Sequence, residues 1–277
     1  MNIKSERLAD TVNRAGQTDP FMVGGKVLSS RFLMGTGKFK NKAEVRDCIR
    51  ASGTQVVTVA LRRIDLTRHE DNILEYLPPD ITLLTNTSGA RNAAEAVRLA
   101  RLAREAGYGT WVKIEVINDS KYLLPDNAET VKATEILAKE GFTVLPYILP
   151  DLNIARALVQ AGAATVMPLG SLIGSNQGLR VKDLIQILIA EIDIPVVVDA
   201  GIGSPSQACE AMEMGADAVL VNTAVATAGN PAGLAQAFAL AIQAGRQAYL
   251  SQPPGPRPFA KASSPLTEFL YNESTAS

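Results

Sequence analysis

The fold is indicated most clearly by residues 107–117, Gly-Tyr-Gly-Thr-Trp-Val-Lys-Ile-Glu-Val-Ile. Two glycines end a helical stretch, and an apolar run follows at once, which is typical of a buried parallel strand. Because side chains alternate along a strand, the apolar residues face one side while Lys113 and Glu115 face the other. The stretch therefore predicts a strand at 111–117 that presents two charged side chains together.

The same pattern recurs along the chain from residue 31 onward. Helical stretches, most of which end in glycine, alternate with short apolar runs, as in repeated βα units. The runs that predict strands are 32–36, 56–61, 82–85, 111–117, 143–147, 165–169, 195–199 and 218–222. This number of strands fits a (β/α)8 barrel, and 277 residues with 47% hydrophobic side chains suffice for one such domain.

Helix starts are marked as clearly as helix ends. Asn92 begins a pattern like a capping box, and Pro205 and Pro231 stand at first helical positions. An open, doubly wound sheet would share this alternation and is the alternative fold. Against it, Gly35 and Gly37 after the first strand lack the third glycine of a dinucleotide-binding loop. We predict an α/β fold with a single (β/α)8 TIM barrel.

The ends of the chain differ in composition from its centre. A polar extension at 1–20 precedes the expected barrel domain at 21–250, and a proline-rich tail at 251–277 follows it. The extension lacks the apolar core of a signal peptide, and no later run has a membrane-spanning length. Cys48 and Cys209 fall in helical stretches without a spaced pattern, which favours a reducing compartment. We therefore expect a cytoplasmic protein.

The overall charge argues against two classes of partner. The formal net charge is -1 and the isoelectric point is about 6.0. Such a chain has no global positive field to attract nucleic acid or an anionic membrane. Any phosphate group must then be bound locally, by a shaped site.

Charged side chains at the ends of the predicted strands indicate where the chemistry lies. Active sites of barrel enzymes form at the carboxyl ends of the strands, where Lys113, Glu115 and Asp199 stand. Burial disfavours a charged lysine, so we expect a lowered pKa that makes the Lys113 amine a nucleophile for imine formation. Glu115 and Asp199 suit the proton transfers of that reaction. The alternatives are a Lys113–Glu115 ion pair that only fills the barrel, and a turn-capping role for Asp199.

A phosphate group is predicted to bind on nearby backbone amides. In barrel enzymes the loops after strands seven and eight often form a phosphate cup. Here those loops, at 200–204 and 222–224, consist mostly of small residues, and a third such loop lies at 169–175. Each loop alone is also ordinary turn chemistry, so the prediction rests on their occurrence together.

Three further residues, one histidine and two arginines, are candidates for the site. His69 is the single histidine and lies in a polar stretch, so we interpret it as a surface residue. Neither a histidine triad nor a zinc site is then available, and we expect no metal and no cofactor. Arg62 and Arg63 directly follow the predicted strand at 56–61. They would contact either an anionic ligand or a neighbouring subunit.

A set of motifs extends from about residue 21 to residue 265. The motifs are Gly-Thr-Gly-Lys38, Val-Ala-Leu-Arg62-Arg63, Thr85-Asn-Thr-Ser-Gly89-Ala, Val-Lys113-Ile-Glu115-Val, Leu-Leu-Pro125-Asp126, Val-Leu-Pro146-Tyr147, Val-Asp199-Ala-Gly-Ile-Gly203-Ser and Asn222-Thr223-Ala224-Val. Together they resemble thiazole synthase, the family that builds the thiazole phosphate part of thiamin.

The resemblance implies roles for eight residues. The family's Schiff-base lysine falls on Lys113, and its acid/base pair falls on Glu115 and Asp199. Its sugar-phosphate contacts fall on Gly174, Ala200, Gly201, Asn222 and Thr223.

The resemblance also implies substrates and partners. 1-Deoxy-D-xylulose 5-phosphate would form an imine on Lys113, take sulfur from the thiocarboxylate of a small ubiquitin-like carrier protein, and condense with dehydroglycine. A homo-oligomer, either dimer or tetramer, is expected, and an enzyme that produces dehydroglycine is a further candidate partner. Neither Cys48 nor Cys209 lies at a strand end, which fits a sulfur source outside this chain. The tail at 253–265 is a candidate part of the carrier-binding surface.

Two other functions share these residues. A Schiff-base aldolase or lyase acting on a sugar phosphate would use Lys113 and the phosphate cup, and would release an aldehyde without a sulfur donor. A non-catalytic sugar-phosphate sensor would use the lysine only as an ionic anchor.

Overall fold

The computed structural model describes residues 19–60, 76–261 and 263. Over these residues, eight strands form one parallel sheet in the order β8-β7-β6-β5-β4-β3-β10-β9. They are β3 (Phe32–Gly35), β4 (Val56–Ala60), β5 (Thr82–Asn86), β6 (Trp111–Ile114), β7 (Thr143–Ile148), β8 (Met167–Pro168), β9 (Val197–Asp199) and β10 (Ala218–Val221). Parallel bridges from Val166 to Val196 and from Leu169 to Asp199 join the two edge strands. The sheet therefore closes, and the prediction of a (β/α)8 TIM barrel is confirmed.

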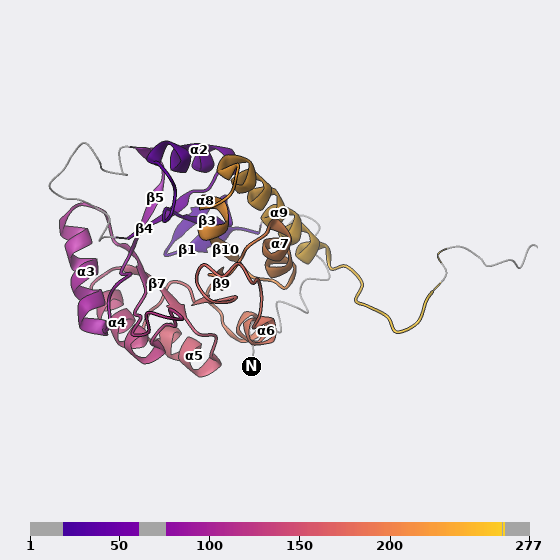
Figure 1. The fold of residues 1–277 in the computed structure, drawn as a ribbon. Coiled ribbons are helices and arrows are strands. Elements are labelled where there is room, and N and C mark those ends of the chain that lie inside the picture. Colours follow the sequence, from indigo (N-terminus) through magenta and orange to yellow (C-terminus); the bar gives the residue numbers. More distant parts are fainter. Residues whose placement is uncertain (1–18, 61–75, 262, 264–277) are drawn as a thin grey trace, which may run out of the picture.

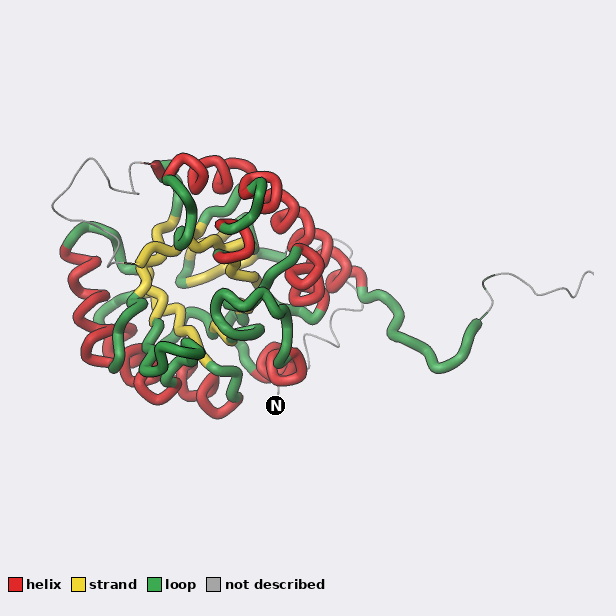
Figure 2. Tube along the Cα trace, in the orientation of Figure 1, coloured by secondary structure: helices red, strands yellow, loops and turns green. Residues whose placement is uncertain are grey.

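Helices surround this barrel on the outside (Figures 1 and 2). They are α2 (Lys42–Ser52), α3 (Ala93–Glu105), α4 (Asn127–Lys139), α5 (Leu152–Gln160), α6 (Lys182–Glu191), α7 (Pro205–Glu213) and α9 (Pro231–Ser251). The short helix α8 (Thr223–Ala226) is not part of this outer ring and lies over the barrel opening in Figure 1. Among the described residues, no helix has both the length and the apolar character needed to cross a membrane.

Local signals placed the helix starts correctly. Asn92 caps α3, since its side chain accepts a hydrogen bond of 2.9 Å from the amide of Glu95. The carboxylate of Glu95 accepts from the amide of Arg91 at 3.0 Å, one residue before the position of a regular capping box. Pro205 and Pro231 stand at the first positions of α7 and α9, as predicted.

Several predicted strands are shorter in the structure, and those predicted at 111–117 and 165–169 lose the most residues. The strand predicted at 111–117 ends at Ile114, because the chain beyond it pairs only through single bridges, from Val116 to Ala90 and from Ile117 to Pro125. The strand predicted at 165–169 keeps a regular ladder only at Met167–Pro168. In both places the apolar run is longer than the regular strand. Residues beyond the ladder, such as Val116 and Leu169, are still buried and therefore still apolar.

The two faces of the barrel wall pack against different partners. Alternate strand residues such as Val112 and Ile114 pack against the helices, and Leu33 and Leu145 fill the interior. The interior is therefore a packed apolar core in its amino-terminal part, as in other barrels of this class.

A short hairpin, which the sequence patterns did not predict, closes the amino end of the barrel. Strand β1 (Phe21–Val23) pairs with β2 (Lys26–Leu28) in antiparallel fashion. Phe21, Val23 and Leu28 pack into the interior core. The hairpin turn has little space, because a Cβ atom on Gly24 would lie 2.5 Å from the Thr143 side chain.

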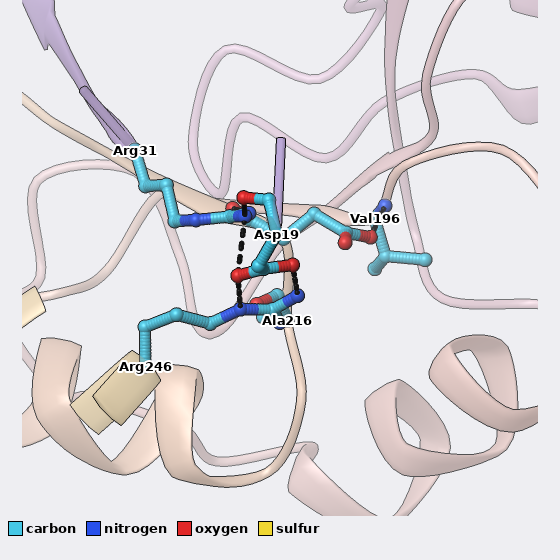
Figure 3. Close-up of polar contacts among 6 residues, drawn as sticks. Asp19, Arg31, Val196, Ala216 and Arg246 are labelled. Atoms are coloured by element: carbon cyan, nitrogen blue, oxygen red, sulfur yellow. Dashed lines mark hydrogen bonds and ion pairs between the residues drawn. The ribbon is translucent and has the colours of Figure 1, made fainter. Parts of the chain in front are cut away.

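An ionic cluster fastens the segment before this hairpin to the barrel. The carboxylate of Asp19 accepts hydrogen bonds from Arg31 Nη2 at 2.7 Å, and from Arg246 Nε at 2.8 Å and Nη2 at 2.7 Å (Figure 3). Arg31 also donates to the backbone oxygen of Asp217 at 2.8 Å, and Arg246 to that of Ala216 at 3.3 Å. The cluster therefore joins the start of the described chain, the start of β10 and helix α9.

Candidate active site

A cavity of about 510 Å³ opens at the carboxyl ends of the barrel strands. Its lining contains all eight residues that the sequence singled out as site residues. These are Lys113, Glu115, Asp199, Gly174, Ala200, Gly201, Asn222 and Thr223. They come from β6 and β9, from the loops that follow β6, β8, β9 and β10, and from the start of α8, so barrel closure is what brings them together.

Lys113, Glu115 and Asp199 form a buried ionic cluster in this cavity. The Lys113 ammonium is in direct contact with the Asp199 carboxylate, and its Nζ lies 3.6 Å from Glu115 Oε2. The three side chains are exposed by only 6%, 9% and 4%, respectively. The prediction that Lys113 and Glu115 point into the barrel is confirmed. The ring centroid of Tyr147 lies 5.0 Å from the same Nζ, a further favourable contact for the cation.

The pKa of Lys113 is raised in this setting, which corrects the sequence prediction of a lowered pKa. Burial by itself lowers the pKa of an amine, and the prediction rests on that effect alone. In the structure, attraction to the carboxylates of Asp199 and Glu115 outweighs burial and raises the pKa of Lys113 above its ordinary value. The resting lysine is therefore an ammonium, and a nucleophilic amine requires that it give up a proton.

Asp199 is placed to accept that proton. Burial raises the pKa of Asp199, the Lys113 ammonium opposes the shift, and the charge of Glu115 adds to it, with a raised pKa as the result. A carboxylate with a raised pKa, in direct contact with the ammonium, can take its proton when the amine attacks a carbonyl. The turn-capping alternative for Asp199 is not seen, since helix α7 is capped by Ser204.

Glu115 is held by a neighbouring strand. The side-chain amide Nδ2 of Asn86 donates to Glu115 Oε2 at 3.0 Å, and Asn86 Oδ1 accepts from the amide of Ser88 at 2.7 Å. The second contact fixes which end of the amide faces Glu115. The Thr87 hydroxyl also accepts from the Glu115 amide at 2.8 Å. Sequence reasoning missed Asn86, although it directly follows the predicted strand at 82–85 and so stands at a barrel strand end.

The loops of the predicted phosphate cup are tightly packed and in unusual backbone conformations. Ala200, Gly201 and Gly174 have φ angles of 63°, 78° and 74°. A Cβ atom on Gly201 would lie 1.9 Å from the Ser171 hydroxyl oxygen, so only glycine fits there. Left-handed residues of this kind turn backbone amides toward a common point, as anion-binding loops do.

The remaining sequence candidates lie elsewhere. Arg62, Arg63 and His69 fall outside the described residues. Cys48 is buried in α2, where burial raises the pKa of its thiol to about 11, and Cys209 lies in α7. Neither cysteine lines the cavity. Across residues 19–60 and 76–261, no group of three or more histidine, cysteine, aspartate or glutamate side chains could hold a metal ion.

A closed parallel barrel, with a lysine held between two carboxylates in the cavity at its carboxyl end, defines a (β/α)8-barrel enzyme. The family described as Thiazole biosynthesis protein ThiG matches residues 22–265. The chain therefore belongs to this family, which comprises thiazole synthases of thiamin biosynthesis.

Known proteins support this assignment over nearly the whole chain. The thiazole synthase of Pelotomaculum thermopropionicum is 64% identical over 252 residues, covering 91% of this chain and 98% of its own length. That of Alkaliphilus metalliredigens is 64% identical over 251 residues, covering 91% and 97%. The crystal structure of the Amycolatopsis orientalis BexX/CysO complex matches with 37% identity and a TM-score of 0.77, covering 88% of this chain and 100% of the matched chain.

Proposed function

We propose that this enzyme holds 1-deoxy-D-xylulose 5-phosphate as an imine on Lys113 and converts it, with dehydroglycine and sulfur from a thiocarboxylated carrier protein, into thiazole phosphate. The single observation that carries the proposal is the contact of Lys113 with both Asp199 and Glu115 in the barrel cavity. A lysine amine can lose its proton and then bond to a carbonyl carbon as an imine, which an arginine guanidinium does not do.

The geometry supports a sequence of proton transfers for imine formation. Asp199 accepts a proton from the Lys113 ammonium, and the freed amine attacks the ketose carbonyl carbon. The carbonyl oxygen then takes up the proton that the attacking nitrogen gives up, so that Asp199 keeps its own proton for the next step. The resulting carbinolamine then loses water when a carboxylic acid of the pair protonates its hydroxyl group. Glu115 is within 3.6 Å of Nζ and is oriented by Asn86, so it can remove a proton from the carbon next to the imine. Tautomers of the ketose imine are reached in this way.

The phosphate group is assigned to the loops around the cavity. Gly174, Ala200, Gly201, Asn222 and Thr223 line the rim of the same cavity as Lys113. Their small side chains leave backbone amides accessible to a phosphate oxygen, which supports the assignment. A phosphate held there would present the ketose carbonyl to the amine below it.

Borohydride reduction tests the imine directly. The whole protein is mixed with 1-deoxy-D-xylulose 5-phosphate and sodium borohydride, and the adduct is located by peptide mass spectrometry. A reduced adduct on Lys113 is expected. The matched control is Lys113→Arg, which should give none, and an adduct on a different lysine of the native chain would contradict the proposal.

A sulfur-carrier protein is the proposed partner. The solved relative from Amycolatopsis orientalis is a complex with a second protein, CysO, which supports a protein partner for this chain. Residues 252–261 are exposed and extend away from the barrel (Figure 1). We assign the tail at 253–265 to the carrier-binding surface. Deletion of 253–277 should weaken carrier binding in a pull-down with the thiocarboxylated carrier, and should leave imine trapping intact.

Assembly and location complete the proposal. We expect a homo-oligomer, dimer or tetramer, in the cytoplasm, and an enzyme that supplies dehydroglycine as a further partner. Analytical ultracentrifugation of the whole chain measures the oligomeric state, and a monomer at micromolar concentration would contradict the expected oligomer.

Product analysis separates this synthase from an aldolase, because an aldolase releases an aldehyde when no sulfur donor is present.

A further inference from the structure

Lys38 reaches across the mouth of the cavity. It lies in the loop between β3 and α2 and lines the same cavity as Lys113. Its ammonium comes close to the loop after β8: a Cβ atom built on Gly174 would lie 3.1 Å from Lys38 Nζ. The same point is 3.6 Å from the hydroxyl oxygen of Thr223, at the start of α8. Three segments that are distant in sequence thus meet beside Gly174, and one of them brings an ammonium group there.

Lys38 differs in its partners from the other cations that line the cavity. Lys113 contacts Asp199 and Glu115, and Arg91 pairs with Glu95 at 3.1 Å. Within the described part of the chain, Lys38 has no carboxylate within salt-bridge distance and no side-chain hydrogen bond. Its charge therefore faces the open cavity without an acidic neighbour.

The backbone of Lys38 is in a costly conformation. Its φ angle is 69°, in the left-handed region that residues with a Cβ atom seldom adopt. Residues held in this way cluster at ligand clamps and active sites, where the surrounding structure holds the strained backbone in place. The conformation is the one from which the Lys38 side chain reaches Gly174.

We propose that Lys38 is the cation that recognises the substrate's phosphate group, and that it sets the preference for a phosphorylated over an unphosphorylated ketose. The inference deepens the proposed function and rests on it for the identity of the ketose. The five residues assigned to the phosphate cup are uncharged, whereas a phosphate monoester carries nearly two negative charges at neutral pH. Lysine binds phosphate as a compact charge, and Gly174 has no side chain that would keep the ammonium away.

The first experiment measures phosphate binding without imine chemistry. Glycerol 3-phosphate has no carbonyl group, so its binding to the whole protein, measured by calorimetry, involves no imine on Lys113. Lys38→Asn removes the charge but suits the left-handed backbone, since asparagine tolerates that region. We expect its Kd to rise about tenfold, the usual size of one charge-assisted hydrogen bond. The control is Lys40→Asn: Lys40 lies in the same loop and is exposed, as Lys38 is, but it does not line the cavity, so the Kd should change by less than about twofold.

The second experiment measures specificity during borohydride trapping. In the native chain, 1-deoxy-D-xylulose 5-phosphate should trap at much lower concentration than 1-deoxy-D-xylulose. In Lys38→Asn the half-saturating concentration should rise about tenfold for the phosphorylated ketose and stay within about twofold for the other. Lys38→Arg, which keeps the charge, should restore most of the difference.

The two proposals fail in different ways. Equal binding of glycerol 3-phosphate by Lys38→Asn and Lys40→Asn, or no binding by the native chain, would overturn the role of Lys38. Binding that depends on Lys38, together with no adduct on Lys113, would support the phosphate site and reject the imine.

Discussion

At the carboxyl end of the barrel one lysine lies between two carboxylates, whereas at the amino end one carboxylate, Asp19, lies between two arginines. Both clusters join segments that are far apart in sequence. At the amino end, the hydrogen bonds from Arg31 and Arg246 lower the pKa of Asp19, so all three groups stay charged. At the carboxyl end, the pKa of Asp199 is raised while it contacts an ammonium that can release its proton.

The two clusters differ in whether a proton can move within the ionic contact. An arginine does not deprotonate in a protein, so the amino-end cluster can only hold its partners in place. A lysine beside a carboxylate with a raised pKa can transfer its proton within the contact. The choice of cation and the ratio of cations to carboxylates therefore separate a cluster that can transfer a proton from one that can only hold its partners. The two also differ in burial, since 28% of the Asp19 side chain is exposed but only 4% of the Asp199 side chain.

Lys113→Arg should have the largest effect, because the cation of the carboxyl-end cluster then no longer loses its proton, as is already the case for the two arginines at the amino end. The charge is kept, but the guanidinium neither loses its proton nor forms an imine. We expect turnover and borohydride trapping to fall below detection, while circular dichroism shows an intact fold. Retained turnover in this variant would mean that the lysine is only an ionic anchor.

Asp199→Asn should have the next largest effect, since it removes one of the two carboxylates. Loss of a proton acceptor in the transition state typically lowers a rate about 100-fold. The sign of the accompanying pH change is also fixed: without the Asp199 charge the ammonium is less stabilised, so the pKa of Lys113 falls. The pH–rate profile for imine formation should move toward lower pH. It is measured by trapping the imine with borohydride at a series of reaction times. A profile at the native position would contradict the contact between these two groups.

Asn86→Leu should have a smaller effect, because it removes the hydrogen bond that orients Glu115 and leaves the cluster itself in place. We expect kcat to fall about tenfold and the KM for the ketose phosphate to stay within about twofold, since a positioning residue acts on the chemical step. The matched control is Asn118→Leu, which lines the same cavity and bonds to Asp126. Equal kcat values in the two variants would exclude the positioning role.

Asp19→Asn should leave activity unchanged and affect only stability. We expect the free energy of unfolding in urea to fall by about 1 kcal/mol at pH 7, a value that allows for partial solvent screening. The pKa of Asp19 is lowered in the folded protein, so its contribution is present above the ordinary value of 3.8 and is lost as the pH falls through the folded value. The difference between native and variant should therefore disappear in acid. Asp80→Asn, at an exposed position, should show no such difference at any pH.

Local patterns were sufficient for much of the fold and for the composition of the site. Glycine-terminated helices and apolar runs gave the order of strands and helices, and alternation along β6 gave the inward direction of Lys113 and Glu115. The hairpin at Phe21–Leu28 was not predicted, because its two strands have three residues each, too few for an alternating pattern to be recognised. Asn86 and Lys38 were not predicted as site residues. The role of Asn86 depends on its hydrogen bond to Glu115, and that of Lys38 on its position beside Gly174, and both neighbours lie on other segments of the barrel.

The order of the strands along the chain, the residues at their ends and the side of the sheet that each faces could be read from short stretches of sequence, since these follow from the repeat of the backbone over a few residues. Three features depend on the folded chain: the barrel closes between β8 and β9, Lys113 meets Asp199 across 86 positions of sequence, and the lysine rests as an ammonium. A pKa is a sum of burial and charge effects from every neighbour in space, and the neighbours that set its sign here are brought together by closure of the sheet.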